Sequence, residues 1–247
     1  MNTVFLILFL VIPVFIGMAI AFMAVNQQGK GLKLLLSFGG AYLLGISFLH
    51  LIPEIYLSSG AAVGIFILVG FLLQLLLEFL SQGIEHGHSH AHDHSHGFPA
   101  LLFISLCIHA FIEAVPLERE VKIAAMPEHS HSGISLLAGI AIHNIPLTVA
   151  LTATLLCYHV KKTKVVIWIG VFALCGPAGA LIGRHFHYDL MLLSPAFFDY
   201  AMGLVIGMFL HISTTILFES SEGHRFNAIK LLAVLTGFAV SYVSSAI

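Results

Sequence analysis

The sequence contains very little charge. Only 9% of its 247 residues are Asp, Glu, Lys or Arg, whereas 59% are hydrophobic. Soluble domains typically carry about 25% charged residues and about 45–50% apolar residues. A chain with so few polar groups could not cover its own surface in water, so lipid must be the solvent for much of it. The composition excludes an ordinary soluble domain and indicates an integral membrane protein.

Other absences narrow the class further. The formal net charge is −2 and no cluster of basic residues occurs, which argues against a nucleic-acid partner. The three cysteines all lie inside apolar stretches, where we expect small core side chains and no disulfide framework. The chain also lacks any long polar segment. We therefore expect residues 1–247 to form a single transmembrane domain with short loops.

Eight apolar stretches are long enough to cross a membrane. A helix needs about 20 residues, within a range of about 17–25, to span the hydrocarbon core. The first stretch is too long for a signal-peptide core and no basic residue precedes it, so we expect it to be a retained helix. The predicted fold class is an all-α integral membrane protein of eight helices, and the fourth and eighth stretches are the weakest. The stretches are Val4–Val25, Leu34–Ile55, Ala61–Leu80, Ala100–Leu117, Ile134–Tyr158, Val165–Ile182, Phe197–Phe218 and Leu231–Ile247.

The distribution of Lys and Arg predicts the orientation. With the N-terminus outside, seven of the ten basic residues fall in cytoplasmic loops and three in external loops. Cytoplasmic loops of membrane proteins carry the excess of Lys and Arg. We therefore expect both termini outside, because the helix count is even, and we place the chain in the plasma membrane.

One loop is rich in histidine. Between the third and fourth stretches, residues 85–97 carry a histidine at every second position: His86, His88, His90, His92, His94 and His96. The segment is too polar to span and too rich in Gly and Ser for a stable helix, so we expect an irregular cytoplasmic loop. Neutral imidazoles in such a run form weak, exchangeable metal sites suited to buffering or sensing. An expression tag is the alternative, but the internal position and the mixed spacers argue against it.

The most informative polar residues lie inside the fourth and fifth stretches. His109 and Glu113 are four residues apart, which places them on one helix face. The next stretch runs antiparallel after a short loop, so His143 should reach a similar depth. Two imidazoles and a carboxylate suit borderline cations such as zinc. A lone buried His is more often a helix-packing partner, but this combination favours a metal site; Asn144 could equally bind the ion or hydrogen-bond across helices.

Polar residues also mark the ends of other stretches. His50 and Glu54 lie at the external end of the second stretch, where they could receive an entering cation or could simply be wetted by headgroups. His211 and Glu219 lie toward the inner face, where an exit site and a structural role are equally compatible with the pattern. Glu78, near the end of the third stretch, is expected to be a terminal charge that snorkels to water.

These motifs resemble those of the ZIP (Zrt-/Irt-like) family of metal transporters, over nearly the whole chain. Eight spans, external termini and a His-rich cytoplasmic loop after the third span are traits of that family. The segments that carry the resemblance are Phe38–Leu44 with His50–Glu54, His109–Glu113, His143–Pro146, and Gly176–Gly183.

The resemblance implies a 3+2+3 bundle in which helices 1–3 and 6–8 are inverted repeats around helices 4 and 5. It implies a metal site between helices 4 and 5, near the midplane, as in many secondary transporters. The transported ion would be Zn²⁺, with Fe²⁺, Mn²⁺ and Cd²⁺ as alternatives, and a homodimer is compatible with it. Ala110, Leu147 and Gly176 stand where two-metal members carry polar or acidic residues. We therefore expect one ion, held by His109 and Glu113 with His143.

Two other functions deserve comparison with metal uptake. A membrane-embedded zinc-dependent hydrolase would use a metal-bound water as nucleophile, but the chain lacks a His-Glu-x-x-His motif. A cation exporter of the diffusion-facilitator type also favours His-rich loops, but that type usually has six spans. We therefore expect a transporter that moves a divalent metal into the cytoplasm, and no enzyme.

Overall fold

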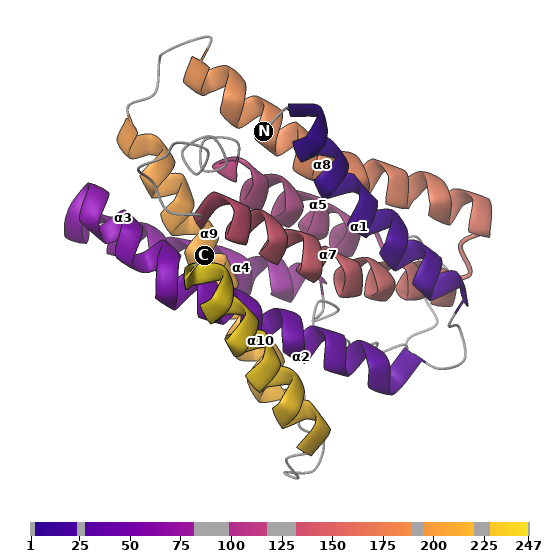
Figure 1. Ribbon diagram of the computed structural model, residues 1–247. Helices are drawn as coiled ribbons and strands as arrows, with labels where there is room; N and C mark the ends of the chain where they lie inside the picture. The colour runs from indigo at the N-terminus through magenta and orange to yellow at the C-terminus, as the bar shows by residue number, and fades with distance from the viewer. Residues whose placement is uncertain are drawn as a thin grey trace.

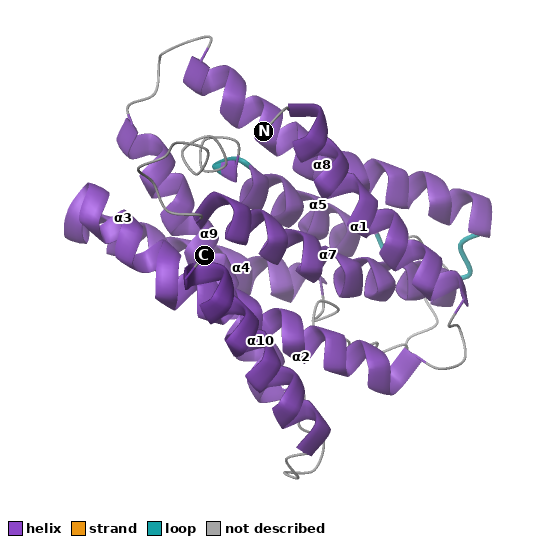
Figure 2. Ribbon diagram, viewed as in Figure 1, coloured by secondary structure: helices purple, strands orange, loops and turns teal. Residues whose placement is uncertain are grey.

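The computed structural model describes residues 3–23, 28–81, 99–117, 132–188, 195–219 and 228–246, and the regular structure within these ranges is entirely helical (Figures 1 and 2). The all-α prediction is therefore confirmed for the described part of the chain. The His-rich segment 85–97 lies outside it. The helices are α1 (Thr3–Met23), α2 (Gln28–Ile46), η1 (Ser47–Leu51), α3 (Ile52–Ser59), η2 (Gly60–Ala62), α4 (Val63–Ser81), α5 (Ala100–Ala114), α7 (Ser132–Cys157), α8 (Lys162–Tyr188), α9 (Pro195–Glu219) and α10 (Ala228–Ala246).

Five helical stretches in the described ranges are long and apolar enough to cross a membrane. They are Thr3–Met23, Gly31–Leu80, Ser135–Cys157, Lys162–Phe186 and Ala196–Phe218. Two shorter apolar helices, Ala100–Ala114 and Ala228–Ser244, correspond to the fourth and eighth predicted stretches. These two stretches were the weakest candidates for membrane spans in the sequence. The long apolar helices together show that the chain is a multi-pass helical protein.

The stretch Gly31–Leu80 contains an irregular turn followed by a reversal. Here α2 passes through the π-helical turn η1 into α3, whose first turn contains Pro53. Proline has no N–H to donate and its ring crowds the carbonyl four residues earlier, so a wider turn relieves the clash. The chain then turns at Gly60, where φ is +67°. This conformation is readily adopted only by glycine, and it separates α3 from α4.

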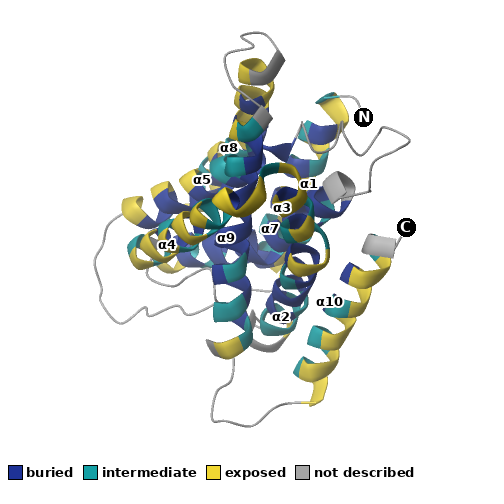
Figure 3. Ribbon diagram, turned by 90° about the vertical axis from the view of Figure 1, so that its left-hand side faces the viewer, coloured by how far each residue is buried: buried dark blue, intermediate teal, exposed yellow. Residues whose placement is uncertain are grey.

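Helix α7 occupies the interior of the bundle. It packs between α1 and α2, while α5 packs against α8 and α4 (Figure 1). Within an apolar segment of 18 residues, 72% of the residues are buried in α7, compared with 33% in α1 and 39% in α8. Figure 3 shows the buried residues gathered on the central helices and the exposed ones along the outer sides of α4, α8 and α10. Helices α5 and α7, which carry the central polar motifs, are therefore held by neighbours on several sides.

The outer surface is strongly apolar. Large hydrophobic side chains that are at least two-fifths exposed follow one another along single helix faces, which soluble proteins avoid on this scale. Such faces are expected where the helices contact lipid tails. Examples are Val4, Phe5, Leu8 and Ile12 on α1, Ile65, Leu68, Leu72 and Phe79 on α4, and Leu232, Leu235 and Val243 on α10.

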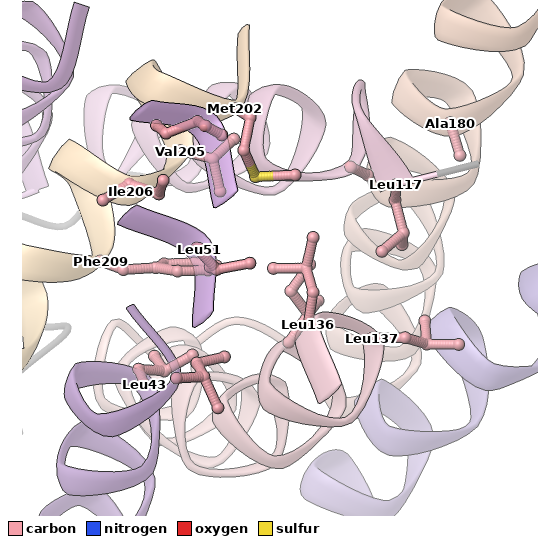
Figure 4. Packing of buried hydrophobic residues seen from close by; sticks show 14 of the residues in the cluster. Leu43, Leu51, Leu117, Leu136, Leu137, Ala180, Met202, Val205, Ile206 and Phe209 are labelled. Atoms are coloured by element: carbon pink, nitrogen blue, oxygen red, sulfur yellow. The ribbon is translucent and has the colours of Figure 1, made fainter. Parts of the chain in front are cut away.

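The buried side chains form two large apolar clusters separated by a polar layer. The first contains α7 residues up to Ile140 and the end of α5 from Ala114 onward; part of it is drawn in Figure 4. The second contains α5 up to Ala110 and α7 from Leu147 onward. The two clusters therefore leave a gap on α5 and α7 at the same level. Glu113, His143 and Asn144 lie in this gap, and His109 lies at its edge, next to Ala110.

Close helix packing depends on glycines that face backbone carbonyls. A Cβ added at Gly70 of α4 would lie 2.0 Å from the carbonyl oxygen of Leu204, and one at Gly207 of α9 would lie 2.0 Å from that of Ile67. These distances are far inside van der Waals contact. Small residues allow helix backbones to approach closely in membranes, where no hydrophobic force drives the helices together. The α4–α9 pair therefore has no room for a side chain at these positions.

We predict that Gly207→Ala destabilises the protein, because the new methyl group must push α9 away from α4. Overpacking of this kind typically costs about 1–3 kcal/mol, so the thermal unfolding midpoint in detergent should fall by several degrees. The matched control is Gly170→Ala on α8, where an added Cβ meets nothing within 4 Å and the midpoint should hold. Equal midpoints for both variants would contradict the close contact.

Candidate metal site

The centre of the site is a histidine–carboxylate pair on α5. His109 and Glu113 lie one turn apart, with Nε2 of the imidazole 3.3 Å from Oε2 of the carboxylate. Their side chains are 0% and 1% exposed. Two tetrahedral zinc ligands at about 2.0–2.1 Å from the ion are about 3.3 Å apart. The pair therefore has the separation that two ligands of one zinc ion require.

Helix α7 adds a second imidazole. The ring of His143 lies with its centroid 6.1 Å from that of His109, at an interplanar angle of 71°, and the residue is 1% exposed. The structure thus brings the two histidines to one depth, as expected for antiparallel spans. Asn144 is 5% exposed, and its Oδ1 accepts no hydrogen bond from the described residues. A buried amide oxygen in this state is available to a cation.

The predicted metal ligands are not all close enough together to contact one ion in this structure. No group of three or more His, Cys, Asp or Glu residues in the described ranges is close enough to hold an ion together. The pair on α5 is in contact, whereas His143 stands back from it by the ring separation given above. A cation bound by all three would therefore draw the His143 ring toward the pair.

A buried glutamine, absent from the predicted site, contacts it directly. Gln74 of α4 is 0% exposed, and its Oε1 lies 2.9 Å from Nδ1 of His109. The contact could not be derived from spacing, because α4 and α5 are separated by a long segment. The sequence nevertheless contained a signal for Gln74. An amide in the middle of an apolar stretch is costly to insert into a membrane, as His109 and Glu113 are, and this cost indicates a specific role.

The site is closed off along the helices by apolar side chains. Ala110 and Leu147, both expected near the metal, belong to the second apolar cluster, and Leu147 is fully buried. A Cβ added at Gly176 of α8 would lie 3.8 Å from the carbonyl oxygen of Ala110, at van der Waals distance. The positions where polar or acidic residues were expected in two-metal relatives are therefore part of an apolar wall that adjoins the polar layer.

A second histidine–carboxylate pair lies between α4 and α9. Nε2 of His211 is hydrogen-bonded to Oε2 of Glu78, with side chains 7% and 15% exposed. The ring of Phe71 packs edge-on against His211 at 4.8 Å. The expectation that Glu78 snorkels to water is therefore wrong. It lies on the face of α4 that packs against α9, where a partner offsets its burial. Helix α9 ends at Glu219, whose side chain lies outside the described residues.

The remaining predicted residues lie apart from this centre. His50 is half-buried on the π-helical turn η1, and its Nε2 has no hydrogen-bond partner among the described residues. Glu54 is half-buried in the first turn of α3. The six histidines from His86 to His96 lie outside the described residues.

A family comparison agrees with this geometry. The family model described as ZIP Zinc transporter matches residues 97–245, a range that contains α5, α7, α8 and α9, all but the last residue of α10, and the His109, Glu113 and His143 motifs. No curated protein matches the chain. The match covers more than half of the sequence. Members of this family are transporters and not enzymes, and their substrates are divalent metal cations. The chain therefore belongs to the ZIP family and is a multi-pass membrane transporter of divalent metal cations.

Proposed function

We propose that the chain carries zinc into the cytoplasm through the site that His109 and Glu113 of α5 form with His143 of α7, with Asn144 as an additional oxygen ligand. One observation carries the proposal: a fully buried imidazole–carboxylate pair with a second imidazole beside it. Burying these groups is costly, and a cation would offset the cost. Imidazole and carboxylate together suit zinc best among the divalent ions that we consider, with Fe²⁺, Mn²⁺ and Cd²⁺ as the alternatives.

We also propose eight spans. The stretch Gly31–Leu80 has 50 helical residues, which would extend about 75 Å at 1.5 Å per residue. The hydrocarbon core is only about 30 Å thick. The turn at Gly60 therefore divides the stretch into two crossings, α2 with α3 and then α4. With α1, α5, α7, α8, α9 and α10, this makes eight in a single transmembrane domain over residues 1–247.

The helix packing supports a 3+2+3 arrangement with inverted repeats. If α1, α2 and α4 are exchanged with α8, α9 and α10, and α5 with α7, the main contacts interchange. The packing of α4 on α9 corresponds to that of α10 on α2, and the packing of α1 on α7 corresponds to that of α8 on α5. Each of these four contacts contains glycines that face the partner helix: Gly70 and Gly207, Gly45 and Gly237, Gly17, and Gly179 with Gly183.

The charge distribution supports an orientation with both termini outside, in the plasma membrane. In this orientation His50 and Glu54 lie toward the exterior, where they would receive the entering cation. His211 with Glu78 lies toward the cytoplasm, as does Glu219, and these would receive the departing ion. The His86–His96 loop follows α4 directly and would buffer the ion after release. A hydrolase is not favoured, because ZIP members are transporters. The direction of flux separates uptake from export, and a homodimer remains an expectation of the resemblance.

The first prediction tests the core site. Replacing His109, Glu113 or His143 by Ala should lower zinc uptake into cells and proteoliposomes by at least about 10-fold, because each change removes a ligand. The matched control is Thr152→Val, which removes a buried hydroxyl of α7 without changing shape. Size-exclusion profiles of the purified variants verify folding. A His109→Ala, His143→Ala double variant with normal zinc flux would disprove the assignment.

The second prediction tests the proposed exit. His211→Ala and Glu78→Ala should each slow zinc flux while leaving Co²⁺ affinity at the core unchanged. Because the two residues form one proposed exit site, zinc flux in the double variant should be no slower than in the slower single variant. The measurement is uptake into proteoliposomes, with Co²⁺ titration of the same preparations. Effects that multiply in the double variant would show that the two residues act independently.

The third prediction concerns stoichiometry. Two dications about 4 Å apart repel each other by about 4 kcal/mol at an effective dielectric constant near 20. With Leu147 in an apolar cluster and Glu113 as the carboxylate of the proposed ligand set, we expect one tightly bound ion. Leu147→Glu should admit a second ion or raise the affinity, whereas Leu147→Met should do neither. Metal counting on protein lacking His86–His96, or anomalous diffraction, measures this. Two filled positions in the unmodified core would refute it.

A further inference from the structure

We infer that Gln74 is the positioning residue of the metal site. Its amide oxygen accepts the Nδ1–H of His109 and thereby leaves the Nε2 lone pair on the side of Glu113, where the cation binds. The inference rests on the proposed function, since it assigns a role to a group that acts through a proposed ligand. Gln74 belongs to α4, outside the residues matched by the family comparison.

The geometry determines which ring nitrogen carries the proton. The two nitrogens of an imidazole point in different directions, and in the neutral ring one is a donor and the other an acceptor. Gln74 Oε1 lies 2.9 Å from Nδ1, and a carbonyl oxygen can only accept. In the neutral ring the proton therefore resides on Nδ1. The lone pair is then on Nε2, the atom that lies 3.3 Å from the Glu113 carboxylate.

Burial makes this bond decisive for the site. Both Gln74 and His109 are 0% exposed, so water does not compete for the imidazole N–H. Hydrogen bonds are electrostatically stronger in such surroundings, and losing one leaves a costly unsatisfied group. Metal-binding histidines almost always donate their other N–H to an acceptor, which sets the tautomer and the ring orientation.

The choice of an amide sets the charge of the site. A carboxylate at this position would also accept the N–H, but it would add a negative charge and make the imidazole a stronger ligand. Gln74 fixes the tautomer and adds no charge beside the Glu113 carboxylate that contacts His109. A transporter must release its ion, so a neutral acceptor favours turnover over tight binding. One turn further along α4, Glu78 approaches His211 instead.

Two substitutions of Gln74 separate positioning from packing. Gln74→Met keeps the size but removes the acceptor, and Gln74→Glu keeps the acceptor and adds charge. The readouts are Co²⁺ titration, followed by visible absorption on protein lacking His86–His96, and zinc uptake kinetics. We expect Gln74→Met to weaken Co²⁺ binding by about 10–100-fold and to raise the KM for uptake. Gln74→Glu should bind more tightly, with lower KM and lower maximal rate.

The opposite order would overturn the inference. If Gln74 only fills space, Gln74→Met is tolerated and Gln74→Glu, which buries a charge, is the damaging change. Gln74→Asn gives an independent check if the Met variant fails to fold. Its side chain is one methylene shorter, so its amide oxygen should not reach His109 and Co²⁺ binding should weaken as in Gln74→Met. Normal Co²⁺ affinity in a folded Gln74→Asn protein would also refute the role.

The controls distinguish the failure of this inference from the failure of the proposed function. Thr152→Val should bind Co²⁺ as the unmodified protein does. In a His109→Ala background, Gln74→Met should cause no further loss, because the residue that it positions is gone. If His109→Ala itself binds Co²⁺ normally, the metal site is wrong. If His109→Ala loses binding and Gln74→Met does not, the site stands and the role of Gln74 is wrong.

Discussion

The close contact of helix backbones through glycine is the constraint on which the rest of the structure depends. Lipid tails are as apolar as leucine side chains, so helices in a membrane gain little by burying apolar surface against each other. They associate where small residues let the backbones meet. Gly179 and Gly183 of α8 face carbonyls of α5, and Gly17 of α1 faces a carbonyl of α7. These contacts place α5 and α7, the helices that carry the proposed ligands, and a side chain added at any of these glycines would push the helices apart.

The polar layer between the two apolar clusters is a consequence of this placement. With α5 and α7 held side by side in antiparallel directions, His109 and His143 reach one level, and the apolar residues before and after them close the site along the helices. The core residues are at most 5% exposed. If these residues bind the transported ion, as we propose, the ion reaches them when one cluster opens, and opening both at once would create a leak. The division of the apolar core into two clusters therefore matches the requirement of alternating access.

Much of this arrangement could be predicted from the sequence because it depends on local rules. The apolar stretches follow from length, and the one-turn spacing of His109 and Glu113 follows from helix periodicity. The level of His143 could be predicted because a short connection between the fourth and fifth stretches makes them run antiparallel. The contacts made by α4 were different. Neither the hydrogen bond between His109 and Gln74 nor the pairing of Glu78 with His211 could be derived, because each depends on which face of α4 meets which neighbour. The error over Glu78 arose because proximity to a helix end does not show whether that end is covered.

Helix α4 therefore contributes polar contacts to the core of the bundle although most of its residues are apolar. It presents two polar side chains, one turn apart, to histidines on two different helices. The nearer one, at the core, is a neutral amide, and the one toward the proposed cytoplasmic side is a carboxylate. An ion that leaves a site with one carboxylate, Glu113, would next meet a second carboxylate with its own imidazole. In the proposed transport path the two sites carry equal charge, so the transfer does not take the ion away from a larger negative charge. A carboxylate at position 74 would break that balance by deepening the first site, and the apolar side chains at 110 and 147 preserve it by adding no further charge.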